Sequence, residues 1–472
     1  MSTLVLLQQY KFTALGPMYL SAMLKNKGHN CILLIEGLEK DILGSIEKIK
    51  PDLIGFQVFT GQQQWALKYA KEIKEKFNIP IIFGGNHTTH NPDIIEKNDC
   101  IDFVCRGEGE YAILELLDKM KQKQDLTNIK NIWTKSNGEV YKNDVRPLAH
   151  PDELPFPDRE LYYRYPLFLN NSVRRFITGR GCPFRCTFCH NHLDIELYKG
   201  KGLWARKRAF SPIIEEIKQL KNKYKMKIVD FSPDDFFFSD RKWALEFLEL
   251  YGKEIKLPFL FNTRPETIDE EIAKALKKAG CRGAAISIES ADDKLRNDVL
   301  KKNTKISDIR KAIKCLKDQN LITKTYNMIG IPGETIEQAI KTLKLNMELK
   351  PTWARCAIIS PYPNTNIWNT GIEEGCLDPM SVDQFSDTYI DETLFKIPNK
   401  NEFINLQRFF PICVRFPFVF PLVKKLIKLP RNKVFDLIGT LAFGYYGTRY
   451  FGHSVRDILK YAYEFVKTSQ PC

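Results

Sequence analysis

The chain contains no run of the roughly 18–20 uninterrupted apolar residues that a bilayer-spanning helix needs. Its most apolar stretch extends from Phe409 to Val423, but Arg415 and three prolines interrupt it. This composition fits a segment that lies on a membrane surface and disfavours one that crosses it. The first residues, Met1 to Tyr10, lack the positive start and cleavage site of a signal peptide, and their short apolar run predicts a first strand.

Dense cysteine spacing, long single-sign charge blocks, low-complexity tracts and short-period repeats are also missing. Twelve cysteines occur among 472 residues, but only three of them are close together. This pattern disfavours a secreted disulfide scaffold and predicts a reducing, cytoplasmic compartment where the close cysteines serve a metal. The formal net charge of +14 is compatible with nucleic acid, anionic lipid or simple solubility, and by itself selects none of them.

What is present indicates a multidomain α/β protein. A length of 472 residues predicts two to four domains, and 43% hydrophobic with 27% charged residues is typical of globular chains. Residues 1 to about 125 alternate short apolar runs with amphipathic helical patterns, which predicts a Rossmann-like, doubly wound parallel sheet. Its expected strands are Leu4–Leu7, Cys31–Ile35, Leu53–Val58, Ile79–Phe83 and Phe103–Cys105.

The rest of the chain divides into a connector, a second repeating series and a tail. We predict a first domain over 1–135 and a linker over 136–170, with a hairpin turn at Asn137-Gly138 and a Pro-rich stretch from Pro151 to Pro157. Six further strand–helix units over 171–375 predict a partial (β/α)6, TIM-like barrel. Residues 376–472 are expected to form a basic, aromatic-rich helical cap. The expected barrel strands are Val173–Ile177, Lys227–Phe231, Phe259–Asn262, Ala284–Ile288, Thr325–Ile329 and Ala357–Ile359.

The three close cysteines, Cys182, Cys186 and Cys189, follow the first strand of the barrel series. Three thiolates at this spacing in a Gly-punctuated loop can converge on an iron–sulfur cluster or on zinc. Zinc prefers four ligands, and His190 or His192 can supply a fourth. The Cys-x₃-Cys-x-Phe-Cys pattern closely resembles the signature of the radical S-adenosylmethionine (SAM) superfamily. That resemblance implies a 4Fe-4S cluster on the three cysteines and SAM as the source of a 5′-deoxyadenosyl radical.

Later segments resemble the same superfamily in the expected order. The strand end Ser232-Pro-Asp-Asp235 resembles its acidic strand end, and Ser287-Ile-Glu289-Ser is similar to its Gly-Ile-Glu-Ser segment near SAM. Gly330-Ile-Pro332-Gly-Glu-Thr335 matches its Gly-x-Pro-Gly-Glu-Thr turn, in which Glu334 and Thr335 are suited to cap the next helix. The resemblance therefore implies SAM contacts at Glu289, Gly330 and Pro332.

The first domain resembles the cobalamin-binding domain that precedes many radical SAM domains. The resemblance implies that two loops cradle the corrin, one with Gly84, Gly85, His87 and Thr88, and one with Gly107, Glu108, Gly109 and Glu110. The Asp-x-His-x-x-Gly motif of methionine-synthase-like domains is absent, so no histidine is expected as the lower cobalt ligand. Asn86 also stands where the family often has proline, and His29 is expected to be structural.

The tail is basic and aromatic, with eleven Lys/Arg against four Asp/Glu over 401–472. It predicts either a helical cap over the barrel or a surface for anionic membrane and lipid, with peripheral membrane contact through 409–433. No RNA-binding module is present, so nucleic acid is not expected as a partner.

Taken together, the resemblances imply a cobalamin-dependent radical SAM methyltransferase acting on an unactivated carbon of a lipid or small-molecule intermediate. An electron donor such as ferredoxin or flavodoxin is implied as well. Three alternatives stay open at this point. They are oxidative cyclisation or rearrangement on the same scaffold, a methylthiotransferase-like enzyme without cobalamin, and a non-enzymatic zinc-binding module.

Overall fold

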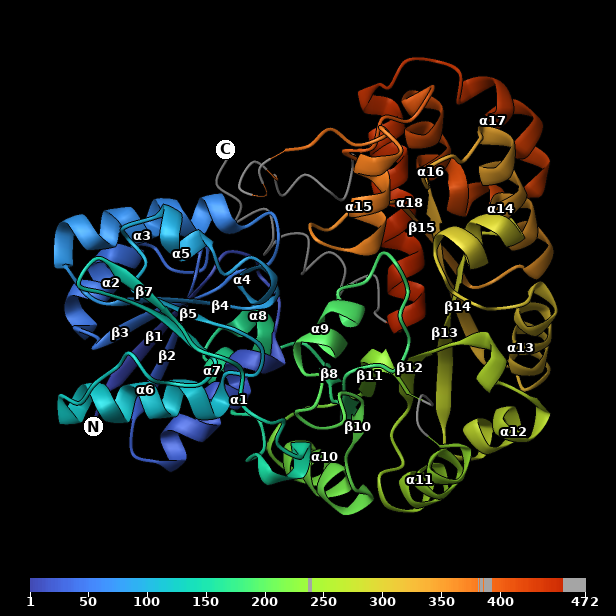
Figure 1. Cartoon of the computed structure of the whole chain (residues 1–472). Helices are drawn as coiled ribbons and strands as arrows, with labels where there is room; N and C mark the ends of the chain where they lie inside the picture. The colour runs from blue at the N-terminus through green and yellow to red at the C-terminus, as the bar shows by residue number, and fades with distance from the viewer. Residues whose placement is uncertain (237–239, 381, 383–384, 386–392, 453–472) are drawn as a thin grey trace.

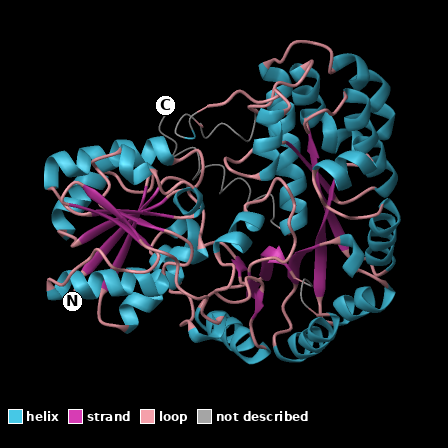
Figure 2. Ribbon diagram, viewed as in Figure 1, coloured by secondary structure: helices cyan, strands magenta, loops and turns pink. Residues whose placement is uncertain are grey.

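A computed structural model describes residues 1–236, 240–380, 382, 385 and 393–452 (Figure 1). The N-terminal part forms one sheet in the order β2-β1-β3-β4-β5-β6-β7, and neighbouring strands from β2 to β5 run parallel. Its parallel strands β1 to β5 are largely apolar and buried, because helices cover both sides of the sheet (Figure 2). The expected doubly wound architecture is confirmed. The elements are β1 (Thr3–Gln8), α1 (Leu15–Asn26), β2 (Asn30–Ile35), α2 (Ile42–Ile49), β3 (Leu53–Gln57), α3 (Gln63–Phe77), β4 (Ile81–Gly84), α4 (Asn86–His90), α5 (Ile94–Lys97), β5 (Phe103–Cys105) and α6 (Glu110–Gln122).

A hairpin extends this sheet beyond residue 135. The strands β6 (Ile132–Ser136) and β7 (Glu139–Lys142) pair antiparallel, and β6 also pairs with β5. Asn137 and Gly138 make the turn with φ values of +53° and +81°, a backbone that Asn-Gly adopts readily.

The segment that follows the hairpin is packed against the first domain through buried tyrosines. It carries two short helices, α7 (Glu160–Tyr163) and α8 (Pro166–Leu169). The hydroxyl of Tyr162 donates a 2.5 Å hydrogen bond to Gln8, and that of Tyr165 donates a 2.9 Å bond to the carbonyl of Leu33. The connection between the two sheets is therefore docked along its length.

The second sheet has six parallel strands in the order β15-β14-β13-β12-β11-β8, the half-barrel expected from the strand–helix repeats. Its last strand begins at Trp353, four residues before the expected Ala357, because Trp353 and Arg355 pair in register with β14. The elements are β8 (Val173–Arg175), β9 (Gly179–Arg180), α9 (Asn191–Leu197), β10 (Arg206–Lys207), α10 (Phe210–Lys223), β11 (Ile228–Asp235), α11 (Arg241–Glu254), β12 (Phe259–Thr263), α12 (Glu270–Lys278), β13 (Cys281–Glu289), α13 (Ile306–Asp318), β14 (Ile322–Ile329), α14 (Ile336–Leu349) and β15 (Trp353–Ile358).

C-terminal helices close the edge and the inner face of the half-barrel. They are α15 (Asn366–Glu373), α16 (Lys400–Arg415), α17 (Phe420–Leu426) and α18 (Lys433–Phe451), drawn in orange to red in Figure 1. α16 packs on β15 and α14. Tyr446 and Tyr450 of α18 pack with Ile228, Leu260 and Trp353, which point to the inner face of the sheet. Among the described residues, no helix has the length and apolar character that a membrane crossing requires.

Candidate active site

The cysteine loop follows β9 and is shaped by backbone constraints. Gly181 has a φ of +78°, and a Cβ there would lie 2.4 Å from the carbonyl oxygen of Trp204, so only glycine fits. Asn191 donates hydrogen bonds to the carbonyls of Cys182 and Phe184, and its own side-chain oxygen accepts a 2.6 Å bond from the Trp204 indole. These contacts fix the turn that carries the first two cysteines.

Cys182 is half-buried, Cys186 is buried and Cys189 is exposed, and none of the three forms a disulfide. Over the described part of the chain, no three Cys, His, Asp or Glu side chains converge closely enough to hold a metal ion. The structure thus places the three cysteines on one loop without bringing their sulfur atoms together. The donor set still fits an iron–sulfur cluster, because three soft thiolates lie within eight residues at the carboxyl end of a barrel strand.

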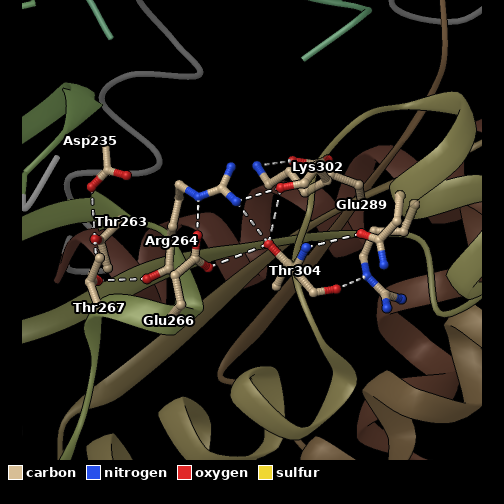
Figure 3. Close-up of polar contacts among 10 residues, drawn as sticks. Asp235, Thr263, Arg264, Glu266, Thr267, Glu289, Lys302 and Thr304 are labelled. Carbon is tan, nitrogen blue, oxygen red and sulfur yellow. Dashed lines mark hydrogen bonds and ion pairs between the residues drawn. The ribbon is translucent and has the colours of Figure 1, made fainter. Parts of the chain in front are cut away.

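Polar side chains line the neighbouring strand ends (Figure 3). Glu289 ends β13 with a φ of +65°, a left-handed backbone that is rare for a residue with a side chain. Its buried carboxylate lies 3.2 Å from the ammonium group of Lys302. Such strain concentrates at functional sites. The position fits the expected SAM contact at Glu289, and the cation opposite it was not found from the sequence.

Arg264 links this rim to the cysteine loop. Its guanidinium lies 3.9 Å from the ring centroid of Phe184 and donates a 3.0 Å hydrogen bond to Thr304. Thr263 donates a 2.9 Å bond to Asp235, the second carboxylate of the acidic strand end. Arg264, Lys302 and Thr304 belong to no sequence motif. The sequence offered one signal for Arg264, which is its position directly after the apolar strand that ends at Thr263.

The Gly330–Thr335 turn is held by its own glutamate. The Glu334 carboxylate accepts hydrogen bonds from the backbone N–H groups of Gly330 and Ile331, and burial raises the pKa of Glu334 to about 8. Thr335 is the N-cap of α14 and forms a capping box with Gln338. The helix cap expected at Glu334 and Thr335 is therefore present, and Thr335 forms it. Glu334 instead shapes the turn that contains Gly330 and Pro332.

In the first domain, the two glycine loops meet at the carboxyl end of the sheet. Gly85 has a φ of +106°, and a Cβ there would lie 2.7 Å from the carbonyl oxygen of Val58. The Thr89 hydroxyl accepts a 3.0 Å bond from the Gly107 N–H, which joins the loops. His87 and Thr88 are fully buried, and the Nδ1 atom of His87 lies 3.3 Å from the Thr60 hydroxyl.

A cavity of about 310 Å³ opens beside these loops, between the sheet and helices α1 and α6. A side chain at Gly16 or at Gly84 would project into it, since a Cβ there has no neighbour closer than 3.7 Å. A glycine-lined, mostly apolar slot at the carboxyl ends of parallel strands fits part of a large cofactor such as cobalamin. The lining includes Leu4, Leu6, Gly16, Gly55, Gly84, Gly85, Gly107, Glu108, Gly109, Glu110 and Arg180.

Glu108 and Glu110 also connect the first domain to the barrel. Arg180, two residues before Cys182, lies 3.3 Å from Glu108 and 2.6 Å from Glu110, and Arg206 pairs with Glu108. Burial raises the pKa of Glu110, but Arg180 outweighs it, so the net shift is below the ordinary value. The carboxylates expected to touch the corrin are thus engaged with arginines. We call Glu108, Glu110, Arg180 and Arg206 the interdomain clamp.

Histidines form a second interdomain contact. His90 of α4 stacks on His190 with ring centroids 5.1 Å apart, and the His190 ring lies 4.7 Å from that of Tyr362. Burial, reinforced by His90, lowers the pKa of His190 to about 3, so this ring is neutral at physiological pH. His29, by contrast, pairs with Asp118 at 3.0 Å and accepts from the Ser2 N–H, a structural role as expected.

Comparison with known proteins agrees with this geometry. A model of the B12 binding domain matches residues 1–117, and a model of the radical SAM superfamily matches residues 176–345. A protein of Pyrococcus horikoshii named an uncharacterized methyltransferase is 32% identical over 379 residues, which are 78% of this chain and 80% of that protein. The anaerobic magnesium-protoporphyrin IX monomethyl ester cyclase of Rubrivivax gelatinosus is 26% identical over 376 residues, 74% of this chain and 64% of the cyclase.

Solved structures share the whole architecture. The radical SAM methyltransferase TsrM from Kitasatospora setae, solved with cobalamin and a 4Fe-4S cluster, aligns with a TM-score of 0.65 at 19% identity, over 80% of this chain and 75% of that one. The cobalamin-dependent radical enzyme OxsB, solved with aqua-cobalamin, aligns with a TM-score of 0.70 at 16% identity, over 95% of this chain and 72% of that one. At these identities the likeness shows the fold.

The fold and the family matches together define a radical SAM enzyme with an N-terminal cobalamin-binding domain. The chain belongs to the family of the Pyrococcus horikoshii protein, which is named a methyltransferase, because the two are 32% identical over most of both chains. Its cofactors are accordingly a 4Fe-4S cluster, SAM and cobalamin.

Proposed function

We propose that the protein transfers a methyl group from SAM to an unactivated carbon of a lipid or small molecule, with a ferredoxin or flavodoxin as electron donor. The observation that carries the proposal is the interdomain clamp. Arg180 contacts both glutamates of the second glycine loop and stands two residues before Cys182. The cobalamin loops and the cysteine loop therefore belong to one continuous site. When bound, the cluster supplies the electron that cleaves SAM, and cobalamin supplies the methyl carrier.

The residues of the chain have separate tasks in this proposal. Cys182, Cys186 and Cys189 hold the cluster, while Glu289 at the end of β13 and Lys302 in the loop opposite it stand where SAM binds. The cavity lined by Gly16, Gly84 and the second glycine loop receives part of the cobalamin. The partly buried His90–His190–Tyr362 contact limits the access of water between the two halves of the site. Residues 1–135, 171–375 and 376–472 act as cobalamin, radical and substrate-covering regions, joined by 136–170.

The test is anaerobic purification with cobalamin present, followed by iron, sulfide and cobalt analysis. We expect about four iron atoms per chain, as a 4Fe-4S cluster requires, together with stoichiometric cobalt. Reduced enzyme should convert SAM to 5′-deoxyadenosine, and Cys186→Ala should lose both iron and that activity. Iron without cobalt under saturating cobalamin would contradict the methyl-transfer proposal and leave the radical enzyme in place. Zinc in place of iron after reconstitution would reject both.

Ring closure is the second candidate, because the chain is similar in sequence to the magnesium-protoporphyrin ester cyclase. The two reactions differ in the fate of the SAM methyl group. Methyl-labelled SAM transfers its label to the product only in the methyltransferase reaction. A product that has lost hydrogen without gaining label would favour the cyclase.

We also propose that the C-terminal helices rest on an anionic membrane surface. Val434, Leu437, Leu441 and Tyr445 are all exposed at helical spacing along α18, and Phe418 near α17 is 79% exposed. Exposed lysines at 424, 425, 428 and 433 flank this apolar stripe. Asp436, the acidic residue in the described part of α18, is already paired with Arg408 and Arg431. An exposed apolar stripe flanked by lysines complements anionic headgroups.

Vesicle sedimentation tests the membrane proposal. The protein should sediment with phosphatidylcholine vesicles that contain phosphatidylglycerol, and less with phosphatidylcholine alone. Replacing both Leu437 and Leu441 with Glu should abolish this binding. Leu203→Glu is the matched control, since Leu203 is 75% exposed but lies outside the stripe. Equal sedimentation of both variants would contradict the proposal.

A further inference from the structure

A second cavity, of about 450 Å³, lies between β15, α16 and α18 on the open side of the half-barrel. Phe188 and Tyr362 are among the residues that line it, and Phe188 stands between Cys186 and Cys189 in the sequence. Tyr362 contacts His190, which stacks on His90 of the cobalamin domain. One end of this cavity therefore reaches the cluster loop and, through three rings, the cobalamin domain. Apart from the cysteine loop, none of the motifs or site residues expected from the sequence lines this cavity. We call it the lateral cavity.

The lateral cavity is mostly apolar but contains two arginines. Met328, Ile358, Pro411 and Phe443 contribute to its lining. Arg408 is neutralised by Asp436, whose carboxylate lies 3.0 Å from the guanidinium. Arg355 is exposed and forms no ion pair with any carboxylate in the described part of the chain. Its guanidinium lies 5.8 Å from the Tyr326 ring and 5.7 Å from the Phe443 ring. Arg355 is therefore a cation available to a ligand inside the cavity.

The inner face behind Arg355 adds more positive charge. On β14, Thr325 bonds outward to Asn346 of α14, so Lys324 and Tyr326 point inward. Tyr326 is the register partner of Arg355, and Lys324 is that of Trp353, a lateral-cavity residue. The carboxylate of Asp230 attracts the Lys324 ammonium and so opposes the lowering of the Lys324 pKa by burial. The same carboxylate lies 3.6 Å from the Arg175 guanidinium. The cations of Arg175, Lys324 and Arg355 thus outnumber the carboxylate that Asp230 supplies to them.

Helix α18 forms the outer wall of the cavity. Phe443 lines the cavity and is at the same time 50% exposed, and Gly439 and Thr440 of the same helix also form the wall. The mouth of the cavity therefore has an apolar, half-exposed ring, that of Phe443, and its wall contains the Arg355 cation.

We infer that the lateral cavity binds the substrate, and that this substrate is an amphiphile with an apolar chain and a carboxylate or phosphate head that pairs with Arg355. The inference rests on the proposed function, for which it names the substrate class. The guanidinium fork fits either oxyanion. Apolar walls from Met328, Ile358 and Phe443 then enclose the chain, and Phe188 brings the bound molecule next to the cluster loop.

Isothermal titration of the anaerobically reconstituted enzyme with octyl phosphate tests this inference. Octyl phosphate should bind, and Arg355→Gln should weaken it at least tenfold, while Arg355→Lys retains part of the affinity. Octanol should bind weakly and equally to wild type and Arg355→Gln. Inorganic phosphate should bind more weakly than octyl phosphate, because it lacks the chain. Octanoate replaces octyl phosphate in a parallel titration and identifies which head group is preferred.

Two further variants locate the effect. Ala357→Phe fills the lateral cavity and should abolish octyl phosphate binding. Arg310→Gln removes the same charge from a surface pair with Glu348 and should change nothing. The inference is overturned if octanol and octyl phosphate bind equally, or if Arg355→Gln matches wild type. Iron, cobalt and 5′-deoxyadenosine formation are measured on the same samples. If these are normal while octyl phosphate does not bind, only the substrate assignment fails.

Discussion

Lys324 has an environment unlike that of an ordinary lysine. Its ammonium lies 4.2 Å from the Trp353 ring and 4.3 Å from the Tyr326 ring, with Tyr450 and Phe451 of α18 farther out. Burial, followed by the repulsion of Arg355 and Arg175, lowers the pKa of Lys324 to about 7, and Asp230 acts in the opposite direction. A buried ammonium group surrounded by aromatic rings and other cations lowers the stability of the fold. Such destabilising charges are common at ligand-binding sites.

Lys324→Met is expected to stabilise the fold and weaken ligand binding. Because the folded-state pKa of about 7 lies below the ordinary 10.5, the unfolded chain binds the proton more tightly. The loss of folding free energy caused by burying the charged Lys324 is therefore complete below pH 7. It disappears as the pH rises toward 10.5. Urea unfolding should show a gain of about 1–3 kcal/mol at pH 6.5 and a smaller gain at pH 9. Lys344→Met, at an exposed position of α14, should show no such difference. A destabilised Lys324→Met variant would contradict this account.

At the scale of elements, the strands and helices follow from local patterns, while the polar rim does not. The apolar runs predict all eleven parallel strands that the structure describes in the two main sheets, because most of their residues are buried. The predicted start of β15 is wrong by four residues. The charged Arg355 lies inside Trp353–Ile358, and in the sequence alone a charge there suggests that the strand starts after it. Lys302 and Thr304 come from a loop, and only the fold brings them to Glu289 and Arg264.

Helix α1 provides a test of the first cavity. Gly16, near its start, faces the cavity, and a Cβ added there would have only Gln57 within 4 Å, so added side-chain volume enters open space. Gly16→Leu should fold with unchanged stability and reduce bound cobalt at least tenfold, because the side chain fills the space for the cofactor. Gly16→Ala is the graded control and should keep most of the cobalt. Iron content should stay the same in both. Full cobalt in Gly16→Leu would show that cobalamin binds elsewhere.

At the scale of the whole molecule, the sequence predicts the two domains separately but not how they are joined. Glu108 and Glu110 stand out as loop residues, yet nothing in the pattern indicates that Arg180 and Arg206 of the barrel neutralise them. A salt bridge between residues 70 positions apart depends on docking, and docking leaves no local periodicity. The same holds for the lateral cavity, whose walls come from the cluster loop, two strands and two C-terminal helices.

The interdomain clamp should couple stability to cobalamin retention. Glu110→Gln leaves Arg180 with the more distant Glu108, so we expect a loss of about 2–4 kcal/mol, as for a broken buried ion pair. Differential scanning calorimetry and cobalt analysis should show a lower Tm together with faster cobalt loss. The double variant Glu110→Leu/Arg180→Met removes both charges and should recover much of the Tm. Arg310→Gln, in an exposed pair, should cost at most about 1 kcal/mol. If Glu110→Gln lowered the Tm no more than Arg310→Gln does, the clamp would contribute no more than a surface ion pair. The clamp would then no longer support a single continuous site for the two cofactors.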